Sequence, residues 1–87
     1  MNLSLNYEHL INQATSFHQN GDFEKAEFYY LKILNQWPNS TAALTNLATL
    51  ALQIGKINHG LELIEKSLKI NQNQPSALNN HGVFLQR

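Results

Sequence analysis

Histidine is the side chain of this sequence best suited to bind a metal ion. The four histidines are His9, His18, His59 and His81. A zinc-binding helix usually presents two ligands three or four residues apart, and no two of these histidines have that spacing. The sequence has no cysteine and one aspartate, Asp22, so other ligands are few. We therefore expect no metal site, and we expect these histidines to pack against neighbours or face solvent.

Serine, histidine and aspartate could in principle form a catalytic triad. However, Asp22 follows a glycine where a helix should begin, a place where its carboxylate suits an N-cap. The sequence has no nucleophile elbow and no phosphate-binding glycine loop. The pairs Glu24–Glu27 and Glu62–Glu65 have the spacing of ordinary solvated charges on a helix. We therefore predict a protein that is not an enzyme, without catalytic residues or a cofactor.

The charge balance excludes further classes of function. Acidic and basic residues number six each, so the basic surface of a nucleic-acid binder or a polybasic membrane binder is missing. No apolar run has the length of a membrane span. The first ten residues lack the basic and apolar regions of a signal peptide. We expect a cytoplasmic protein that binds neither nucleic acid nor membranes.

Residues 20–40 carry the signals of a turn, a helix and a second turn. Gly21 can adopt the left-handed conformation that ends a helix, and Asp22 can cap the next one. Pro38 ends that helix, and Asn39–Ser40 offers another cap. The expected buried stripe of this helix consists of Phe23, Ala26, Tyr30, Ile33 and Leu34. Phe28 and Tyr29 should lie toward the outer surface or the neighbouring helix.

The whole chain repeats this pattern with a period of 34 residues and no gap. Leu10 aligns with Leu44 and Leu78, and Gly21 aligns with Gly55. Such a period is typical of helical repeat proteins. The predicted helices are 5–20, 22–36, 40–54, 56–70 and 75–87.

The first unit resembles a tetratricopeptide repeat (TPR) at nearly every signature position. The matching residues are Leu10, Ala14, Phe17, Gly21, Phe23, Ala26, Tyr30 and Pro38. The second unit departs from the pattern at Gly60, Ser67 and Gln72. The resemblance implies an all-α fold, a right-handed superhelix of antiparallel helical hairpins. Its units would be 7–40, 41–74 and the first helix of a third at 75–87, within a single domain that is expected to be a fragment of a longer array.

Small residues should mark close contacts between helices. Ala26 is expected where two backbones approach, with Phe17, Phe23 and Tyr30 filling the space on either side. Gly60 stands at the equivalent place of the second unit, where the family has alanine. Because glycine weakens a helix interior by about 1 kcal/mol, replacement of Gly60 by alanine is expected to stabilise the protein.

By resemblance, the first helix of each unit lines a concave groove. The expected groove residues are Ile11, Asn12, Thr15, Thr45, Asn46, Thr49, Asn79, Asn80 and Val83. One asparagine per unit, at positions 12, 46 and 80, forms what we call the asparagine row. Family members that hold a terminal carboxylate use lysine and arginine here. The matching places in this chain are Ile11, Thr15, Ser76 and Asn80, and only Asn46 fits the pattern, so a carboxylate clamp is not expected.

Two classes of function fit this groove. The leading prediction is a non-catalytic scaffold that binds a peptide or a helix of a protein partner on the concave face. The alternative is the N-terminal substrate-recognition segment of a larger enzyme, because the asparagine row resembles the groove of O-linked GlcNAc transferases. The two classes differ in whether the gene encodes a catalytic part beyond this chain.

Trp37, His81 and the apolar residues of the last helix suggest further contacts. Trp37 is expected to pack over the end of its own helix and onto the following unit, with a partner anchor as the alternative. His81 is expected against the preceding helix or at a self-association surface. The last helix has apolar residues and no following helix to cover them. These residues are Leu78, Val83, Phe84 and Leu85, and they predict a homodimer through the C-terminal helix.

Overall fold

The computed structural model describes residues 3–86, which form five α-helices. The helices are α1 (Leu3–Gln19), α2 (Phe23–Gln36), α3 (Thr41–Gln53), α4 (Ile57–Ile70) and α5 (Pro75–Leu85). Each boundary lies within two residues of the one expected from the sequence. The all-α architecture is therefore confirmed, and the described residues contain no strand.

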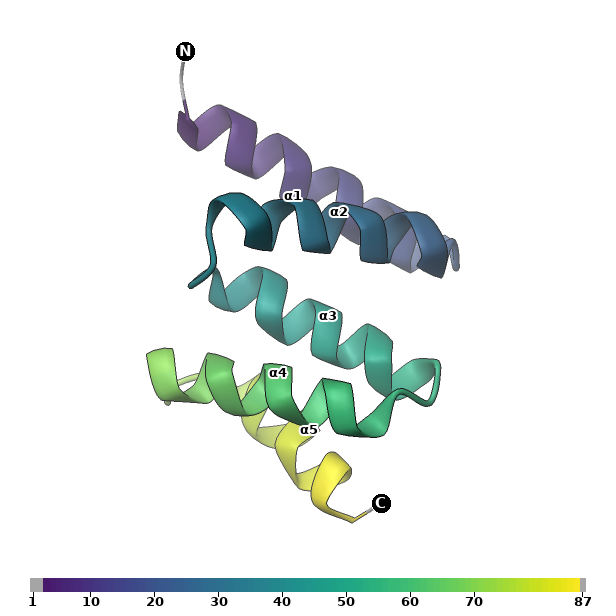
Figure 1. The fold of residues 1–87 in the computed structure, drawn as a ribbon, viewed down its shortest axis with the longest axis vertical. Helices are drawn as coiled ribbons and strands as arrows, with labels where there is room; N and C mark the ends of the chain where they lie inside the picture. Colours follow the sequence, from purple (N-terminus) through teal and green to yellow (C-terminus); the bar gives the residue numbers. More distant parts are fainter. Residues whose placement is uncertain (1–2, 87) are drawn as a thin grey trace.

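The helices stack in chain order along the longest dimension of the molecule, which is 43 Å (Figure 1). Helices α1 and α2 form one antiparallel hairpin and α3 and α4 form the next, while α5 packs on α4. The odd helices also approach one another, α1 with α3 and α3 with α5. Within residues 3–86, the backbones of α2 and α4 do not come into contact with each other. The stack is therefore tighter on the side of α1, α3 and α5, which is the concave side of a solenoid.

The glycines inside both hairpins and the caps of α2 and α3 are built as the sequence predicts. Gly21 and Gly55 have φ values of 80° and 84°, the left-handed region that favours glycine. Asp22 caps α2 by accepting a hydrogen bond from the Lys25 amide, at 3.3 Å. Ser40 caps α3 in the same way, accepting from the Ala43 amide at 3.2 Å. These turns fix the 34-residue period in space.

The core of the first hairpin continues into the second. Ala26, Tyr30 and Ile33 are fully buried in α2, and Phe23 and Leu34 pack against them half-buried. The buried stripe expected for α2 is therefore confirmed. Phe28 is 62% exposed on the outer surface, and the Tyr29 ring stacks on Phe17 at 5.5 Å between centroids.

Gly60 corrects an expectation, because its missing side chain makes room for an aromatic ring. A Cβ at Gly60 would lie 2.4 Å from Cζ of Phe84 and 3.1 Å from Cβ of Ala51. In the preceding unit, Ala26 and Leu50 occupy the equivalent places, and both belong to the buried core. At the second interface, a glycine and a phenylalanine therefore stand where the first interface has an alanine and a leucine. Phe84 is only 3% exposed, so the expectation that α5 leaves it uncovered was wrong.

Replacing Gly60 by alanine should therefore destabilise the protein, contrary to the expectation from helix propensity. Overpacking against the Phe84 ring costs about 1–3 kcal/mol, and the gain in helix propensity offsets about 1 kcal/mol of it. Urea unfolding measures the net loss. Gly82→Ala is the matched control, because a Cβ at this helical glycine meets nothing within 4 Å. Gly82→Ala should stabilise by about 1 kcal/mol, and a more stable Gly60→Ala variant would contradict the packing described here.

Candidate functional site

The asparagine row follows the concave side, but its three side-chain amides differ in exposure and in hydrogen bonding. Asn12 is exposed on α1, while Asn46 on α3 and Asn80 on α5 are half-buried. The Asn80 amide donates a hydrogen bond to Thr49 Oγ1 at 2.6 Å, so one of its N–H groups is used within the protein. Among the residues that the structure describes, no partner holds the side-chain amide of Asn46. Asn46 is therefore the central amide that remains open to a ligand.

A hollow of about 480 Å³ lies beside Asn46, between α1, α2 and α3. Its lining residues are Thr15, His18, Gln19, Gly21, Phe23, Tyr30, Asn46 and Gln53. The Thr15 hydroxyl donates to the Ile11 carbonyl at 2.9 Å, which leaves its oxygen free to accept a hydrogen bond. The hollow is thus lined by the Asn46 amide and the Thr15 hydroxyl, together with the aromatic residues Phe23 and Tyr30.

His18 holds three helices together at this hollow. Its Nδ1 lies 3.0 Å from the Tyr30 hydroxyl on α2, and its Nε2 lies 2.6 Å from Gln53 Oε1 on α3. Because an amide oxygen only accepts, Nε2 carries the proton, and Nδ1 of the neutral ring accepts from Tyr30. Burial raises the pKa of Tyr30 to about 12, so this hydroxyl keeps its proton at ordinary pH.

The sequence reasoning did not identify His18 and Gln53 as groove residues. His18 follows Thr15 by three residues, and Gln53 follows Thr49 by four. Residues three and four apart lie on one face of a helix, so the same spacing rule could have found both.

Thr45 does not line the groove, so the expectation for this residue was wrong. It is 7% exposed and turns away from the groove toward α4, where its hydroxyl lies 2.7 Å from Ser67 Oγ. It also donates to Gln74 Oε1 at 3.0 Å, and the Gln74 amide donates to the Ser67 carbonyl at 3.0 Å. In the first unit, Ile11 and Ile33 stand where Thr45 and Ser67 stand in the second. Thr45 is therefore part of a polar contact that joins α3, α4 and the residue before α5, and its hydroxyl is closed to a ligand.

The other expected groove residues keep surface available. Ile11, Thr49 and Val83 are half-buried and Asn79 is exposed. Ile11 also packs against the core of the first hairpin. The Thr49 hydroxyl donates to the Thr45 carbonyl at 3.0 Å and accepts from Asn80, so its proton and one of its two acceptor positions are used. Apart from the exposed Asn79 on α5, the available polar groups therefore gather around Asn12, Thr15 and Asn46.

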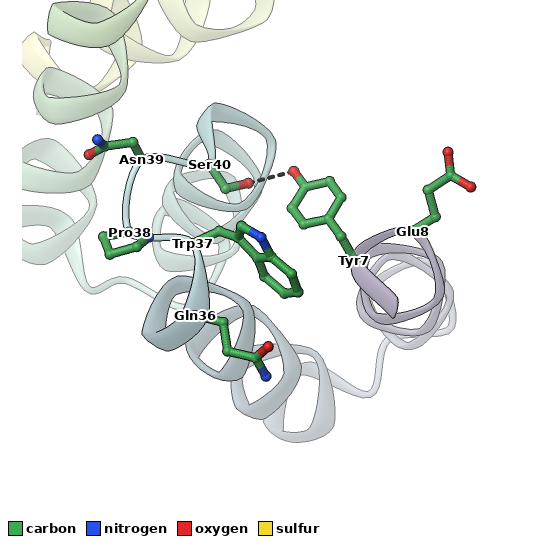
Figure 2. A pocket seen from close by; sticks show the side chains of 7 residues that line it. All are labelled: Tyr7, Glu8, Gln36, Trp37, Pro38, Asn39 and Ser40. Carbon is green, nitrogen blue, oxygen red and sulfur yellow. Dashed lines mark hydrogen bonds between the residues drawn. The ribbon is translucent and has the colours of Figure 1, made fainter. Parts of the chain in front are cut away.

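A second hollow, of about 700 Å³, lies at the opposite end of α1 (Figure 2). Its lining residues are Tyr7, Glu8, Gln36, Trp37, Pro38, Asn39 and Ser40. The Trp37 ring meets Tyr7 edge to face with centroids 5.0 Å apart, and the Tyr7 and Ser40 hydroxyl oxygens lie 2.6 Å apart. Trp37 is half-buried against the core, as expected from the sequence, but its ring partner is Tyr7 on α1 of the same unit, which the sequence did not indicate.

The remaining polar side chains do not assemble into a metal site. Residues 3–86 contain no group of three histidine, aspartate or glutamate side chains placed to hold an ion. His81 lies against the preceding helix as expected, with Nε2 3.5 Å from Glu65 Oε2 on α4. None of the described helices is both long enough and apolar enough to span a bilayer.

Comparison with known proteins adds one finding. A family model described as a tetratricopeptide repeat matches residues 17–79, which is most of the chain and includes both hairpin turns. No curated protein matches the sequence.

Proposed function

Because the chain belongs to the tetratricopeptide repeat family, we propose that it is a non-catalytic scaffold that binds an extended peptide of a protein partner. Domains of this family generally mediate protein–protein interaction. The proposed binding surface is the concave side formed by α1, α3 and α5. The observation that carries the proposal is the open amide of Asn46, which lies beside the hollow between α1 and α3.

The chemistry of this groove suits the backbone of a peptide. An amide side chain both donates and accepts, so it can pair with the N–H and C=O of one extended residue. Packed helical layers are about 10 Å apart, close to the length of three extended residues. A peptide along the groove could therefore meet Asn12 and Asn46 at a regular interval.

The groove does not require a free carboxylate in its ligand. No lysine or arginine stands at the places where family members clamp a C-terminus, and nothing else in the hollow beside Asn46 carries a permanent positive charge. We therefore expect binding to an internal peptide segment. Each hydrogen bond contributes only about 1 kcal/mol net, so the affinity should be weak, high micromolar or poorer.

Replacing Asn46 by alanine should weaken peptide binding about fivefold, the equivalent of one hydrogen bond. The ligands are peptides selected from a display library against the native protein, then titrated by calorimetry as free acid and as amide. Asn58→Ala is the matched control, because Asn58 is an exposed asparagine on α4, away from the concave side. Both peptide forms should bind alike. Binding that needs the free carboxylate, or that is unchanged in Asn46→Ala, would overturn the proposal.

The location of the protein and its alternative function stay predictions from the sequence alone. One is the cytoplasmic location. The other is the alternative function, in which the chain recognises substrates for a larger enzyme of the GlcNAc-transferase type. Sequencing the complete gene tests that alternative directly, because a catalytic domain must follow in the same reading frame.

A further inference from the structure

The hollow of about 700 Å³ at the start of α1, which we call the aromatic hollow, is built around two rings (Figure 2). Tyr7 on α1 and Trp37 after α2 meet edge to face, an arrangement that leaves most of their ring faces free of each other. Both residues are half-buried and line the hollow. The hydroxyl oxygens of Tyr7 and Ser40 lie 2.6 Å apart, which fixes the Tyr7 ring in this orientation. The hollow therefore presents a preformed aromatic surface.

The polar groups around these rings favour a cation. Glu8 is the single charged residue among the seven that line the hollow, and it is exposed on α1 next to Tyr7. None of the ion pairs within residues 3–86 involves its carboxylate. Gln36 and Asn39 add exposed amide oxygens on the side of α2 and the following turn. Because the face of an aromatic ring also attracts positive charge, the rings and the oxygen atoms select the same kind of ligand.

The internal repeat shows that neighbouring units do not cover this place. Its equivalent in the second unit has a hairpin before it and α5 after it. Nevertheless Ala42 and residues 70–73 are exposed there, with Ile70 at 42%. The second unit has Thr41, Ala42 and Asn71 where the first has Tyr7, Glu8 and Trp37. The repeat therefore forms without the rings and the acid, and their combination is specific to the first unit.

We propose that the aromatic hollow binds an arginine side chain of a protein partner. A planar guanidinium lies flat on an aromatic ring and donates hydrogen bonds from its edge to carboxylate and amide oxygens. The volume of about 700 Å³ falls in the usual range of ligand pockets, so residues beside the arginine have room as well. This site lies at the opposite end of α1 from the hollow beside Asn46. It is therefore a second contact, independent of the proposed peptide groove.

The probe is a capped pentapeptide with arginine at its centre and glycine elsewhere, titrated into the native chain at constant ionic strength. Trp37 is the only tryptophan of the chain, so its fluorescence reports on the hollow directly. We expect a saturable change with a dissociation constant of about 1 mM, because one exposed side chain makes few contacts. The matched peptide has citrulline, which keeps the length of arginine but carries no charge. It should bind at least about fivefold more weakly.

The variant Glu8→Gln removes the charge at an exposed position and keeps the size of the side chain. It should weaken binding of the arginine peptide about fivefold and leave binding of the citrulline peptide unchanged. Glu24→Gln is the control, because Glu24 is exposed on α2 and does not line the hollow. Asn46→Ala should also bind the arginine peptide like the native chain, since Asn46 belongs to the other hollow. Circular dichroism checks that each variant is folded.

Three results would overturn the proposal. The first is a Trp37 fluorescence that does not respond to the arginine peptide up to about 20 mM. The second is equal binding of the arginine and citrulline peptides, which would mean that the hollow does not select a charge. The third is an equal loss in Glu8→Gln and Glu24→Gln, the behaviour of non-specific attraction to the whole protein. None of these results would affect the peptide groove around Asn46, which is tested separately.

Discussion

Replacing Ala26 by leucine should lower the free energy of unfolding by about 1–3 kcal/mol. Ala26 has no exposed surface and lies in the core that α2 shares with α1 and α3, among Leu10, Tyr30 and Leu50. Interiors of this kind are packed without voids, so the added atoms must displace a helix or force unfavourable rotamers. Urea unfolding followed by circular dichroism at 222 nm gives the difference from the native chain.

The control for this substitution is Lys32→Leu, which adds leucine to an exposed position of the same helix. Surface substitutions usually change stability by less than about 0.5 kcal/mol, so this variant should unfold close to the native midpoint. An Ala26→Leu variant with the native midpoint would show that α1 and α2 are not in close contact here. The assigned repeat register would then be wrong.

Raising the pH from 10 to 12 should remove about 2 kcal/mol of stability through Tyr30 alone. The pKa of this phenol is about 12 in the folded state, because of burial, against 10.0 when it is exposed. A folded pKa above the unfolded one means that the unfolded chain releases the proton first as the pH rises. The stabilisation is therefore complete below pH 10 and is lost as the pH passes through 12.

The Tyr30→Phe variant isolates this effect, because lysine titration in the same range is common to both proteins. The variant loses the hydrogen bond to His18 at every pH, but its stability should decline less steeply between pH 10 and 12. Urea midpoints of the two proteins at half-unit pH intervals provide the comparison. Parallel curves would contradict the burial of the Tyr30 hydroxyl.

Much of the fold can be predicted from the sequence because the repeat encodes it locally. Gly21 and Gly55 set the turns, Asp22 and Ser40 set the caps, and the apolar spacing sets which faces are buried. These signals act within a few residues and occur in register in each unit. For this reason helix boundaries and the buried stripe of α2 were predicted closely.

Contacts between helices were harder to predict, because they depend on pairs of residues far apart in the sequence. Gly60 alone indicates a weakened helix, and only the ring of Phe84 above it reverses the expected effect of alanine. Thr45 has the spacing of a groove residue, but Ser67 and Gln74 draw its hydroxyl into the interface. A family pattern describes single positions, so it cannot predict contacts that depend on two residues together.

The claim that the groove of α1, α3 and α5 binds the partner peptide is tested most directly by nuclear magnetic resonance. Peptides selected against the native chain are added to ¹⁵N-labelled protein, and the backbone and side-chain amide shifts are followed. We predict that the largest changes occur at Asn12, Thr15 and Asn46, with the Asn46 side-chain amide among them. Changes centred on Phe28 and Leu31 at the outer surface of α2, with the Asn46 amide unmoved, would contradict it.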